Sequence, residues 1–338
     1  MINNPILITG VYRSGTTYLS RLLDSHPGLN ITYDSVNYFR YNLKKNTNPK
    51  NYKEIVTEIT TRLENRYEKS LNSDLIIKNL GKFRNITHKD IYSEIMMKYF
   101  NNDGKRWGEK TLLEWSNIPT FLSMFEKSQA IHILRDPRDV LASYKNMTIE
   151  TGDKYLDSIF ANLNSFNKAI EYINTLPNNR YKIVIYEDLI DNPEKIAKEL
   201  CDFLNLEYTK EMLNSDNYKD LSGDKLTIST HSSYGSNDNK KPVNRWKEKL
   251  ENDEVKLLEA IMENQMKYFN YDVFYKDNDF SWLIETLDGT PLLKERLINY
   301  FYTKDGIESY PSDPTVSSSW GGDTGVKGQG ASAAYGRK

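Results

Sequence analysis

The residues of this sequence that are best suited to chemistry lie near its start, in the stretch GVYRSGTT (10–17). Its hydrogen-bond donors and its turn residue are Arg13, Ser14, Gly15, Thr16 and Thr17. The short apolar run PILIT (5–9) precedes it, and helical spacing of leucines follows it. A glycine-rich turn between a strand and a helix directs backbone N–H groups and the helix N-terminus at one point. The stretch therefore predicts a cradle for an anion, and the alternative is a turn that only joins the two elements.

The stretch differs at one residue from the phosphate-binding loop of nucleoside-triphosphate enzymes. That loop has the pattern G-x-x-x-x-G-K-[ST], and Gly10, Gly15 and Thr17 match it. Thr16 stands where the pattern has its lysine, which reaches the γ-phosphate. We therefore expect a ligand that has no γ-phosphate or that other cations hold.

A second polar stretch, RDPRDVLAS (135–143), supplies such a cation. Arg135 follows a predicted strand at 130–134, and Ser143 lies on the predicted helix after it. Open α/β sheets bind ligands at the carboxyl ends of their strands, where a guanidinium and a hydroxyl can hold a second phosphate. Two anion sites on adjacent strands would suit a nucleotide that is phosphorylated at two places. The alternative is a capping and salt-bridge cluster of Arg135, Asp136, Arg138 and Asp139.

The elements that must position these residues alternate along the chain. Apolar runs at 5–9, 130–134 and 182–186 predict buried strands, and helical spacing follows each of them. Strands that alternate with helices favour a parallel sheet with helices on both faces. We predict an α/β fold with a P-loop-like parallel sheet.

The domain boundaries follow from composition. We expect one domain over residues 1–290 with a helical insertion at about 44–100, because charged, helix-compatible stretches fill that region. Residues 214–244 have a polar, loop-like composition, and 253–269 predicts a closing helix. A C-terminal extension would cover 291–311, and the Gly/Ser/Ala-rich residues 312–338 predict a disordered tail.

Composition excludes several classes of protein. The 45 Lys and Arg residues nearly balance the 47 Asp and Glu residues, so no overall field favours nucleic acid or an anionic membrane. Cys201 is the single cysteine, which excludes an internal disulfide and a cysteine zinc site. The sequence contains no run of about 18 apolar residues, so we expect no membrane span. The first apolar run follows only MINN, which is too short for the start of a signal peptide. We expect a cytoplasmic protein.

At this point the sequence resembles the sulfotransferases that use 3′-phosphoadenosine 5′-phosphosulfate (PAPS). RSGTT (13–17) resembles their loop for the 5′-phosphosulfate, and RDPRDVLAS resembles their 3′-phosphate segment, with Arg135 and Ser143 as ligands. YEDLIDNPEKIAKELCDFLNL (186–206) is similar to their third segment, whose tyrosine, here Tyr186, lies beside the nucleotide. The missing lysine is then explained, because PAPS has no γ-phosphate. The resemblance implies PAPS as co-substrate, 3′,5′-adenosine bisphosphate (PAP) as product, and no metal.

The likeness is strongest to the branch that holds protein-tyrosine sulfotransferases and bacterial glycan sulfotransferases. LDSHPGLNITYD (23–34) resembles a stretch that ends in a catalytic carboxylate, here Asp34. GEKT (108–111) matches the stretch whose lysine, here Lys110, stabilises the transferring sulfuryl group. KPVNRW (241–246) resembles the segment that covers the nucleotide, and it implies contacts from Lys241, Asn244 and Arg245. Ser233 is a candidate donor to the sulfuryl group, with Ser232 and Ser236 as alternatives.

Three positions depart from the family's patterns. The cytosolic branch has a catalytic histidine just after a Lys-Thr pair, but Leu112 follows Thr111 here, which favours a carboxylate as base. The usual glutamate is the shorter Asp34, and Met147 stands where a basic residue is often found. We interpret the four histidines as structural.

The acceptor and two rival functions stay open. We predict transfer to a hydroxyl of a saccharide or glycolipid, with a peptide tyrosine or a small metabolite as the alternative. Aromatic residues in the region of Asp34 could stack on a sugar, hold a peptide or simply pack: Tyr33, Tyr38, Phe39, Tyr41 and Tyr52. The rivals are a P-loop kinase, which Thr16 disfavours, and a PAP-binding protein without turnover, which Asp34 and Lys110 disfavour. The sequence indicates no oligomeric state.

Overall fold

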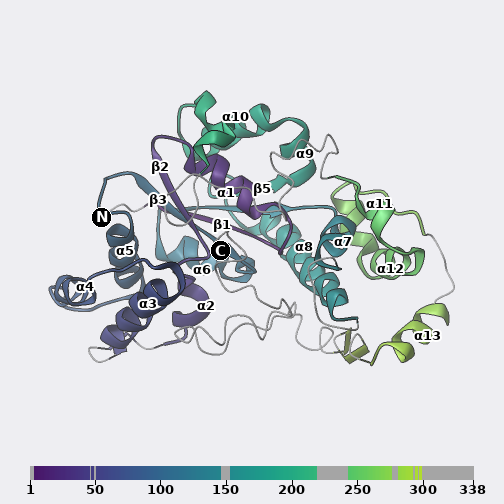
Figure 1. Ribbon diagram of the computed structural model, residues 1–338, viewed down its shortest axis with the longest axis horizontal. Helices are drawn as coiled ribbons and strands as arrows, with labels where there is room; N and C mark the ends of the chain where they lie inside the picture. The colour runs from purple at the N-terminus through teal and green to yellow at the C-terminus, as the bar shows by residue number, and fades with distance from the viewer. Residues whose placement is uncertain are drawn as a thin grey trace.

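The computed structural model of the protein describes residues 4–45, 47–48, 51–145, 153–218, 243–275, 281–291, 294–295 and 297–298 (Figure 1). Within these residues five strands form one sheet in the order β2-β3-β1-β4-β5, and every neighbouring pair is parallel. The strands are β1 (Ile6–Gly10), β2 (Leu29–Tyr33), β3 (Arg106–Leu112), β4 (Gln129–Leu134) and β5 (Tyr181–Ile185). The predicted α/β fold with a parallel sheet is confirmed.

Three of the strands arise from the apolar runs of the sequence. β1, β4 and β5 are the predicted strands at 5–9, 130–134 and 182–186 with shifts of about one residue, and Tyr186 begins a helix instead of ending β5. Each of β1 and β4 is buried along its whole length. Side chains along them alternate between the two faces of the sheet, so both faces need a cover of helices.

The strands β2 and β3 were not predicted. β3 carries the sequence RWGEKTL, and its charged residues Glu109 and Lys110 are almost fully buried. Apolar periodicity does not detect such a strand, because it contains charged residues. These charges can be buried because contacts from other parts of the chain compensate them. In the sheet, β3 lies between β2 and β1.

Helices cover both faces of the sheet (Figure 1). On one face α1 (Thr16–Asp24), α9 (Tyr186–Asp191) and α10 (Pro193–Leu204) share an apolar core with Ile6, Ile8 and Ile131. On the other face α6 (Ile118–Met124) and α8 (Asp157–Thr175) contribute to a core that contains Leu7. Cys201 packs inside the first core.

The predicted helical insertion contains three helices. They are α3 (Asn51–Tyr67), α4 (Ser73–Leu80) and α5 (His88–Tyr99), and the short helix α2 (Tyr38–Asn42) precedes them. They share a core with Trp107 of β3, so they pack against the β3 side of the sheet. α5 begins with a capping box in which Thr87 and Asp90 satisfy each other's backbone N–H groups.

Two C-terminal helices, α11 (Trp246–Lys249) and α12 (Asn252–Tyr268), lie beside α7 (Pro137–Lys145) and α8 (Figure 1). α12 is the predicted closing helix and packs on α8, while α11 packs on α7. α13 (Ser281–Gly289) follows them. Among the helices described here, none combines the length and the apolar character that crossing a bilayer requires. The tail at 312–338 lies outside the described residues.

Candidate active site

The loop between β1 and α1 has the geometry of an anion cradle. Arg13 and Gly15 have positive φ angles of 66° and 94°, and Ser14 lies between them. Such alternation turns successive backbone N–H groups toward one side of the loop. Ser14 closes the turn by donating from its Oγ to the carbonyl of Val11 at 2.6 Å. α1 is nine residues long, and its first N–H groups have no partner within the helix, so they complete the cradle.

Gly15 is required by the approach of Tyr186. A Cβ atom on Gly15 would lie 2.2 Å from the ring of Tyr186, and the positive φ of Gly15 independently disfavours other residues. Tyr186 is the first residue of α9, directly after β5, and is 1% exposed. The tyrosine of the third predicted segment therefore lies against the predicted phosphate loop.

Arg13, Arg135 and Ser143 join the two predicted anion motifs. Arg135 Nη1 donates to the carbonyl of Arg13 at 2.7 Å, and its guanidinium carbon lies 4.6 Å from the centroid of the Tyr186 ring. Arg13 Nε donates to Ser143 Oγ at 2.9 Å. Arg13 thus extends from the first motif to the second. Two guanidinium groups and a hydroxyl gather at the junction, which fits a nucleotide with two separate phosphates.

Asp34, at the end of β2, and Lys110, on β3 next to β1, form a buried ion pair. The Asp34 carboxylate accepts from the Lys110 ammonium, and the backbone N–H of Asp34 donates to the Lys110 carbonyl at 2.7 Å. Asp34 is 8% exposed and Lys110 is 1% exposed. Lys110 therefore has Asp34 as its ion-pair partner. Glu114 pairs with Arg40 at 3.4 Å.

The sheet register relates this pair to the phosphate loop. Lys110 is aligned with Tyr33 of β2 on one side and with Ile8 of β1 on the other. Just beyond the strands, Leu113 N–H donates to the carbonyl of Gly10 at 3.2 Å. Because neighbouring strands are about 4.8 Å apart, the ends of β2 and β1 are separated by about 10 Å. A ligand bound at the loop can span that distance.

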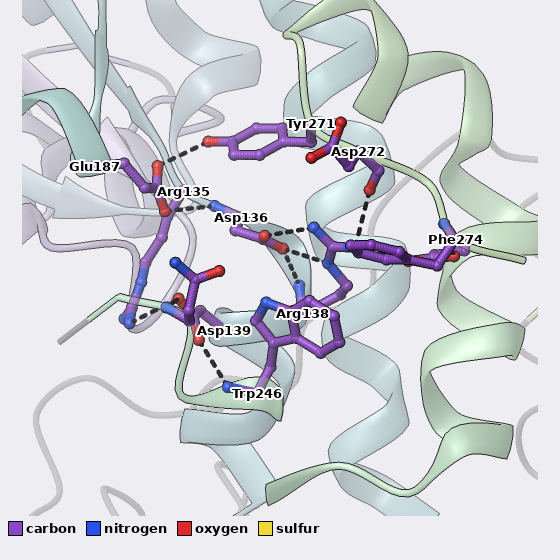
Figure 2. A network of polar contacts seen from close by, with 11 residues as sticks. Arg135, Asp136, Arg138, Asp139, Glu187, Trp246, Tyr271, Asp272 and Phe274 are labelled. Carbon is purple, nitrogen blue, oxygen red and sulfur yellow. Dashed lines mark hydrogen bonds and ion pairs between the residues drawn. The ribbon is translucent and has the colours of Figure 1, made fainter. Parts of the chain in front are cut away.

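The segment around Asn244 is attached to the helix that follows Arg135. Asp139 Oδ2 accepts from the backbone N–H of Asn244 at 2.8 Å, and its Oδ1 accepts from that of Trp246 at 3.0 Å (Figure 2). Asp139 also lies 3.7 Å from Arg135. Residues Asn244 and Arg245 are thus held near the second anion motif. Ser233 and Lys241 lie outside the described residues.

Arg138 belongs to a structural network instead of a ligand site. Its guanidinium donates to both oxygens of Asp136 and to the carbonyl of Asp272 at 2.9 Å (Figure 2). It also donates to Glu259 Oε1 at 2.7 Å. Asp136 also caps α7 by accepting from the Arg138 N–H at 2.9 Å. The salt-bridge alternative is therefore correct for Arg138 and Asp136, which tie α12 and the residues after it to the start of α7.

Glu187 adds a titratable group to this network. Its Oε1 accepts from the backbone N–H of Asp136 at 3.0 Å, and its Oε2 accepts from the Tyr271 hydroxyl at 2.8 Å (Figure 2). Burial raises the pKa of Glu187 to about 7, and hydrogen bonds oppose part of that rise. Protonation of Glu187 near neutral pH is therefore expected.

The described histidines have structural partners. His132 contacts Tyr181 and Ser165 through its two ring nitrogens, and burial lowers its pKa to about 3. His26 accepts the N–H of Gly28 at 3.0 Å, and His88 contacts the Tyr38 hydroxyl at 2.8 Å. His231 lies outside the described residues. The structural interpretation fits the three histidines that are described.

The aromatic residues in the region of Asp34 mostly pack in the core. Four of them are at most 5% exposed: Tyr33, Tyr38, Phe39 and Tyr52. Tyr41 is half-buried and its ring lies 5.4 Å from the Arg62 guanidinium carbon. Of the three roles that the sequence left open for this group, packing therefore accounts for the four buried members.

Comparison with known proteins agrees with this geometry. A sequence model of the sulfotransferase family matches residues 5–210. A Caenorhabditis briggsae protein named as a candidate protein-tyrosine sulfotransferase is 22% identical over 82% of this chain and 92% of its own length. The fold is similar to that of the sulfotransferase domain from the curacin biosynthetic pathway, with a TM-score of 0.53 and 20% identity over 80% of this chain and 99% of that domain.

A second solved structure has the same degree of likeness. The sulfotransferase domain from the Synechococcus PCC 7002 olefin synthase has a TM-score of 0.53 and 21% identity over 80% of this chain and 97% of that domain. The matched residues 5–210 run from β1 past α10, so they contain all five strands and the loops at their carboxyl ends. This chain therefore belongs to the sulfotransferase family, as an enzyme that takes its sulfuryl group from PAPS.

Proposed function

We propose that the enzyme transfers the sulfuryl group of PAPS to an acceptor hydroxyl, with Asp34 as general base and Lys110 as electrostatic stabiliser. The observation that carries this proposal is the buried Asp34–Lys110 pair at the sheet edge where the phosphate loop ends. A carboxylate and an ammonium at one point can address the two groups whose charge changes in the reaction, the acceptor hydroxyl and the sulfuryl oxygens.

Each residue then has one task in the reaction. Asp34 accepts the proton of the acceptor hydroxyl while that oxygen forms its bond to sulfur. Lys110 offsets the negative charge on the sulfuryl oxygens as the bond from sulfur to the phosphate oxygen of PAP breaks, in line with the attack. Arg13 and the N–H groups at the start of α1 hold the 5′-phosphate, while Arg135 and Ser143 hold the 3′-phosphate.

For the acceptor, we keep a hydroxyl of a saccharide or glycolipid as the first candidate, reached in the cytoplasm. A peptide tyrosine is the second candidate, because the relative from Caenorhabditis briggsae carries the name of a tyrosine sulfotransferase. The packing of Tyr33, Tyr38, Phe39 and Tyr52 in the core removes them as acceptor-stacking residues, so they favour neither candidate.

Two measurements test the proposal. In a thermal-shift assay PAP should raise the melting temperature, and ATP with Mg²⁺ should raise it far less, because Thr16 replaces the lysine that reaches a γ-phosphate. Labelled PAPS offered with a library of saccharides, glycolipids and tyrosine peptides should then give a labelled product. Stabilisation by ATP and Mg²⁺ alone would support a kinase, and tight PAP binding without product would support a non-catalytic protein.

A further inference from the structure

The turn after Asp34 has a backbone that needs to be held in place. Asp34 and Asn37 have φ angles of 51° and 47°, in the left-handed region. This region costs most residues about 1–2 kcal/mol relative to ordinary backbone, and Asp and Asn tolerate it better because their short side chains can form local hydrogen bonds. The direction of the Asp34 side chain depends on this turn, and aspartate reaches one methylene less far than the family's usual glutamate. A small shift of the turn would therefore move the carboxylate away from an acceptor.

Glu109 lies on the face of the sheet opposite to Lys110 and accepts hydrogen bonds from this turn. Its Oε1 accepts from the backbone N–H groups of Val36 and Asn37 at 2.7 and 2.8 Å, and its Oε2 accepts from the Tyr92 hydroxyl. Glu109 is 0% exposed. Burial raises its pKa, and hydrogen bonds from Tyr92 and Asn37 oppose that rise. Burying a carboxylate costs free energy unless hydrogen-bond donors surround it. The three donors directed at Glu109 therefore require a strong hydrogen-bond acceptor at this position.

Helix α3 supplies further contacts to the same turn. The Tyr67 hydroxyl donates to the carbonyl of Asp34, and the Arg62 guanidinium donates to that of Ser35. The Asn37 side chain donates to the Asp34 carbonyl at 3.0 Å. Glu109 accepts from the N–H groups of the turn, and the donors from Tyr67, Arg62 and Asn37 bind the carbonyl groups of the turn. The insertion helices thus contribute directly to the placement of Asp34.

Glu109 and Lys110 are neighbours in β3, so their side chains point to opposite faces of the sheet. Lys110 binds the Asp34 carboxylate on one face, and Glu109 binds the following turn on the other. We infer that Glu109 is a positioning residue for the reaction: through Val36 and Asn37 it fixes the Asp34 carboxylate against Lys110. This inference rests on the proposed role of Asp34 as base. Glu109 itself is directed away from the Asp34 carboxylate, so it does not serve as an alternative base.

The experiment is a double-mutant cycle of Glu109→Gln and Asp34→Asn, measured in a single turnover with PAPS and the acceptor that the library screen selects. Glutamine keeps the size and one accepting oxygen but loses the charge that strengthens the two N–H bonds. Because a misplacement of 1 Å can cost about 100-fold, we expect Glu109→Gln to slow turnover about 10- to 100-fold. The affinity for PAP should change less than about twofold, since the hydrogen-bond partners of Glu109 among the described residues lie in the turn after Asp34 and at Tyr92, outside the anion cradle.

The cycle separates positioning from a general loss of structure. If Glu109 acts through Asp34, then Glu109→Gln should cost less than about twofold in the Asp34→Asn background. The matched control is Glu259→Gln, because Glu259 is also 0% exposed and its Oε2 accepts from two consecutive N–H groups, those of Phe274 and Tyr275, at 2.9 and 3.0 Å. Any rate loss from Glu259→Gln should be the same in the wild-type background and in the Asp34→Asn background.

The outcomes are distinguishable. An equal loss from Glu109→Gln in both backgrounds, or no loss in either, would overturn the inference while Asp34 stays the base. Wild-type turnover by Asp34→Asn would overturn the base assignment and the inference with it. If Glu109→Gln does not fold, Tyr92→Phe replaces it, because it removes one donor to Glu109 and keeps the buried ring. Tyr92→Phe should then show a smaller loss that also disappears in the Asp34→Asn background.

Discussion

Asp34 and Lys110 are linked twice, by an ion pair between their side chains and by a hydrogen bond of 2.7 Å from the Asp34 N–H to the Lys110 carbonyl. The two residues are far apart in the sequence but adjacent in the sheet, because β2 pairs with β3. The backbone bond fixes their relative position, and the ion pair compensates two charges that are almost fully buried. Removal of either charge therefore affects folding as well as chemistry.

We predict that Asp34→Asn loses both activity and stability. Turnover should fall by about 10²–10⁴, the usual contribution of a general base. The free energy of unfolding should fall by about 3–5 kcal/mol, because Lys110 is left buried without its counter-charge. Single-turnover kinetics and urea denaturation measure the two effects. The added substitution Lys110→Met should recover part of the lost stability and none of the activity.

If the variant that combines Asp34→Asn with Lys110→Met is no more stable than Asp34→Asn alone, the buried charge of Lys110 is not the cause of the loss in stability. PAP provides an independent check, since on the proposed placement its 5′-phosphate would give Lys110 a new anionic partner. The shift in melting temperature caused by PAP should therefore be larger for Asp34→Asn than for the wild type.

Gly15 and Gly104 form a matched pair for the second prediction. Both have left-handed backbones, with φ angles of 94° and 81°, but an added Cβ would meet the Tyr186 ring only at Gly15 and would meet nothing within 4 Å at Gly104. Gly104→Ala should cost only about 1–2 kcal/mol of backbone strain. Gly15→Ala should cost about 1–3 kcal/mol more and weaken PAP binding at least about 10-fold, because Tyr186 must move. Equal stabilities, with PAP affinity retained in both, would show that the Tyr186 contact is unimportant.

The sequence predicted the parts of the fold that local patterns encode. β1, β4 and β5 are apolar runs, and α1, α7, α10 and α12 follow helical spacing with recognisable ends. β2 and β3 escaped prediction, since the polar sequences LNITY and RWGEKTL become strands only through their neighbours in the sheet. Buried Glu109 and Lys110 are stable there because Tyr92, the turn after Asp34 and Asp34 itself satisfy them.

For the site, motifs identified candidate residues but not their partners. The resemblance indicated Asp34 and Lys110 separately, yet only the β2–β3 pairing shows that they form an ion pair. Likewise Arg13 was expected at the first phosphate, and its bond to Ser143 places it at the junction of both motifs. The role of Glu109 had one signal in the sequence: a charged residue directly beside Lys110 must point to the other face if the segment is a strand.

Arg135 should discriminate between nucleotides with and without a 3′-phosphate. Loss of a charge-assisted hydrogen bond costs about 1.5–3 kcal/mol, so Arg135→Ala should weaken PAP about 10- to 150-fold and leave 5′-AMP nearly unchanged. Titration calorimetry with both nucleotides measures the ratio. Arg106→Ala is the control, because Arg106 is also buried but lies at the amino end of β3, where it donates to the carbonyl of Leu204 at 2.9 Å and to Gln129 at 2.7 Å. Equal weakening of PAP and AMP by Arg135→Ala would contradict the 3′ assignment.

Glu187 should make folding stability depend on pH near neutrality. Its pKa is raised from 4.5 to about 7, chiefly by burial, so the folded protein binds a proton that the unfolded chain has released. The stabilising contribution of Glu187 is therefore complete below about pH 4.5 and is lost as the pH rises through about 7. Since one pKa unit corresponds to about 1.4 kcal/mol, the loss amounts to at most about 3.5 kcal/mol.

The variant Glu187→Gln isolates this effect, because glutamine does not titrate but can still accept from the Asp136 N–H and contact the Tyr271 hydroxyl. Urea denaturation of both proteins between pH 4 and 8 gives the difference in their free energies of unfolding. That difference should change in favour of Glu187→Gln as the pH rises, and most steeply between about pH 5 and 7. Other groups, His132 among them, titrate equally in both proteins and cancel in the difference. A constant difference, or one that favours the wild type at high pH, would show that Glu187 is ionised in the folded protein throughout this range and that its contacts with Asp136 and Tyr271 outweigh its burial.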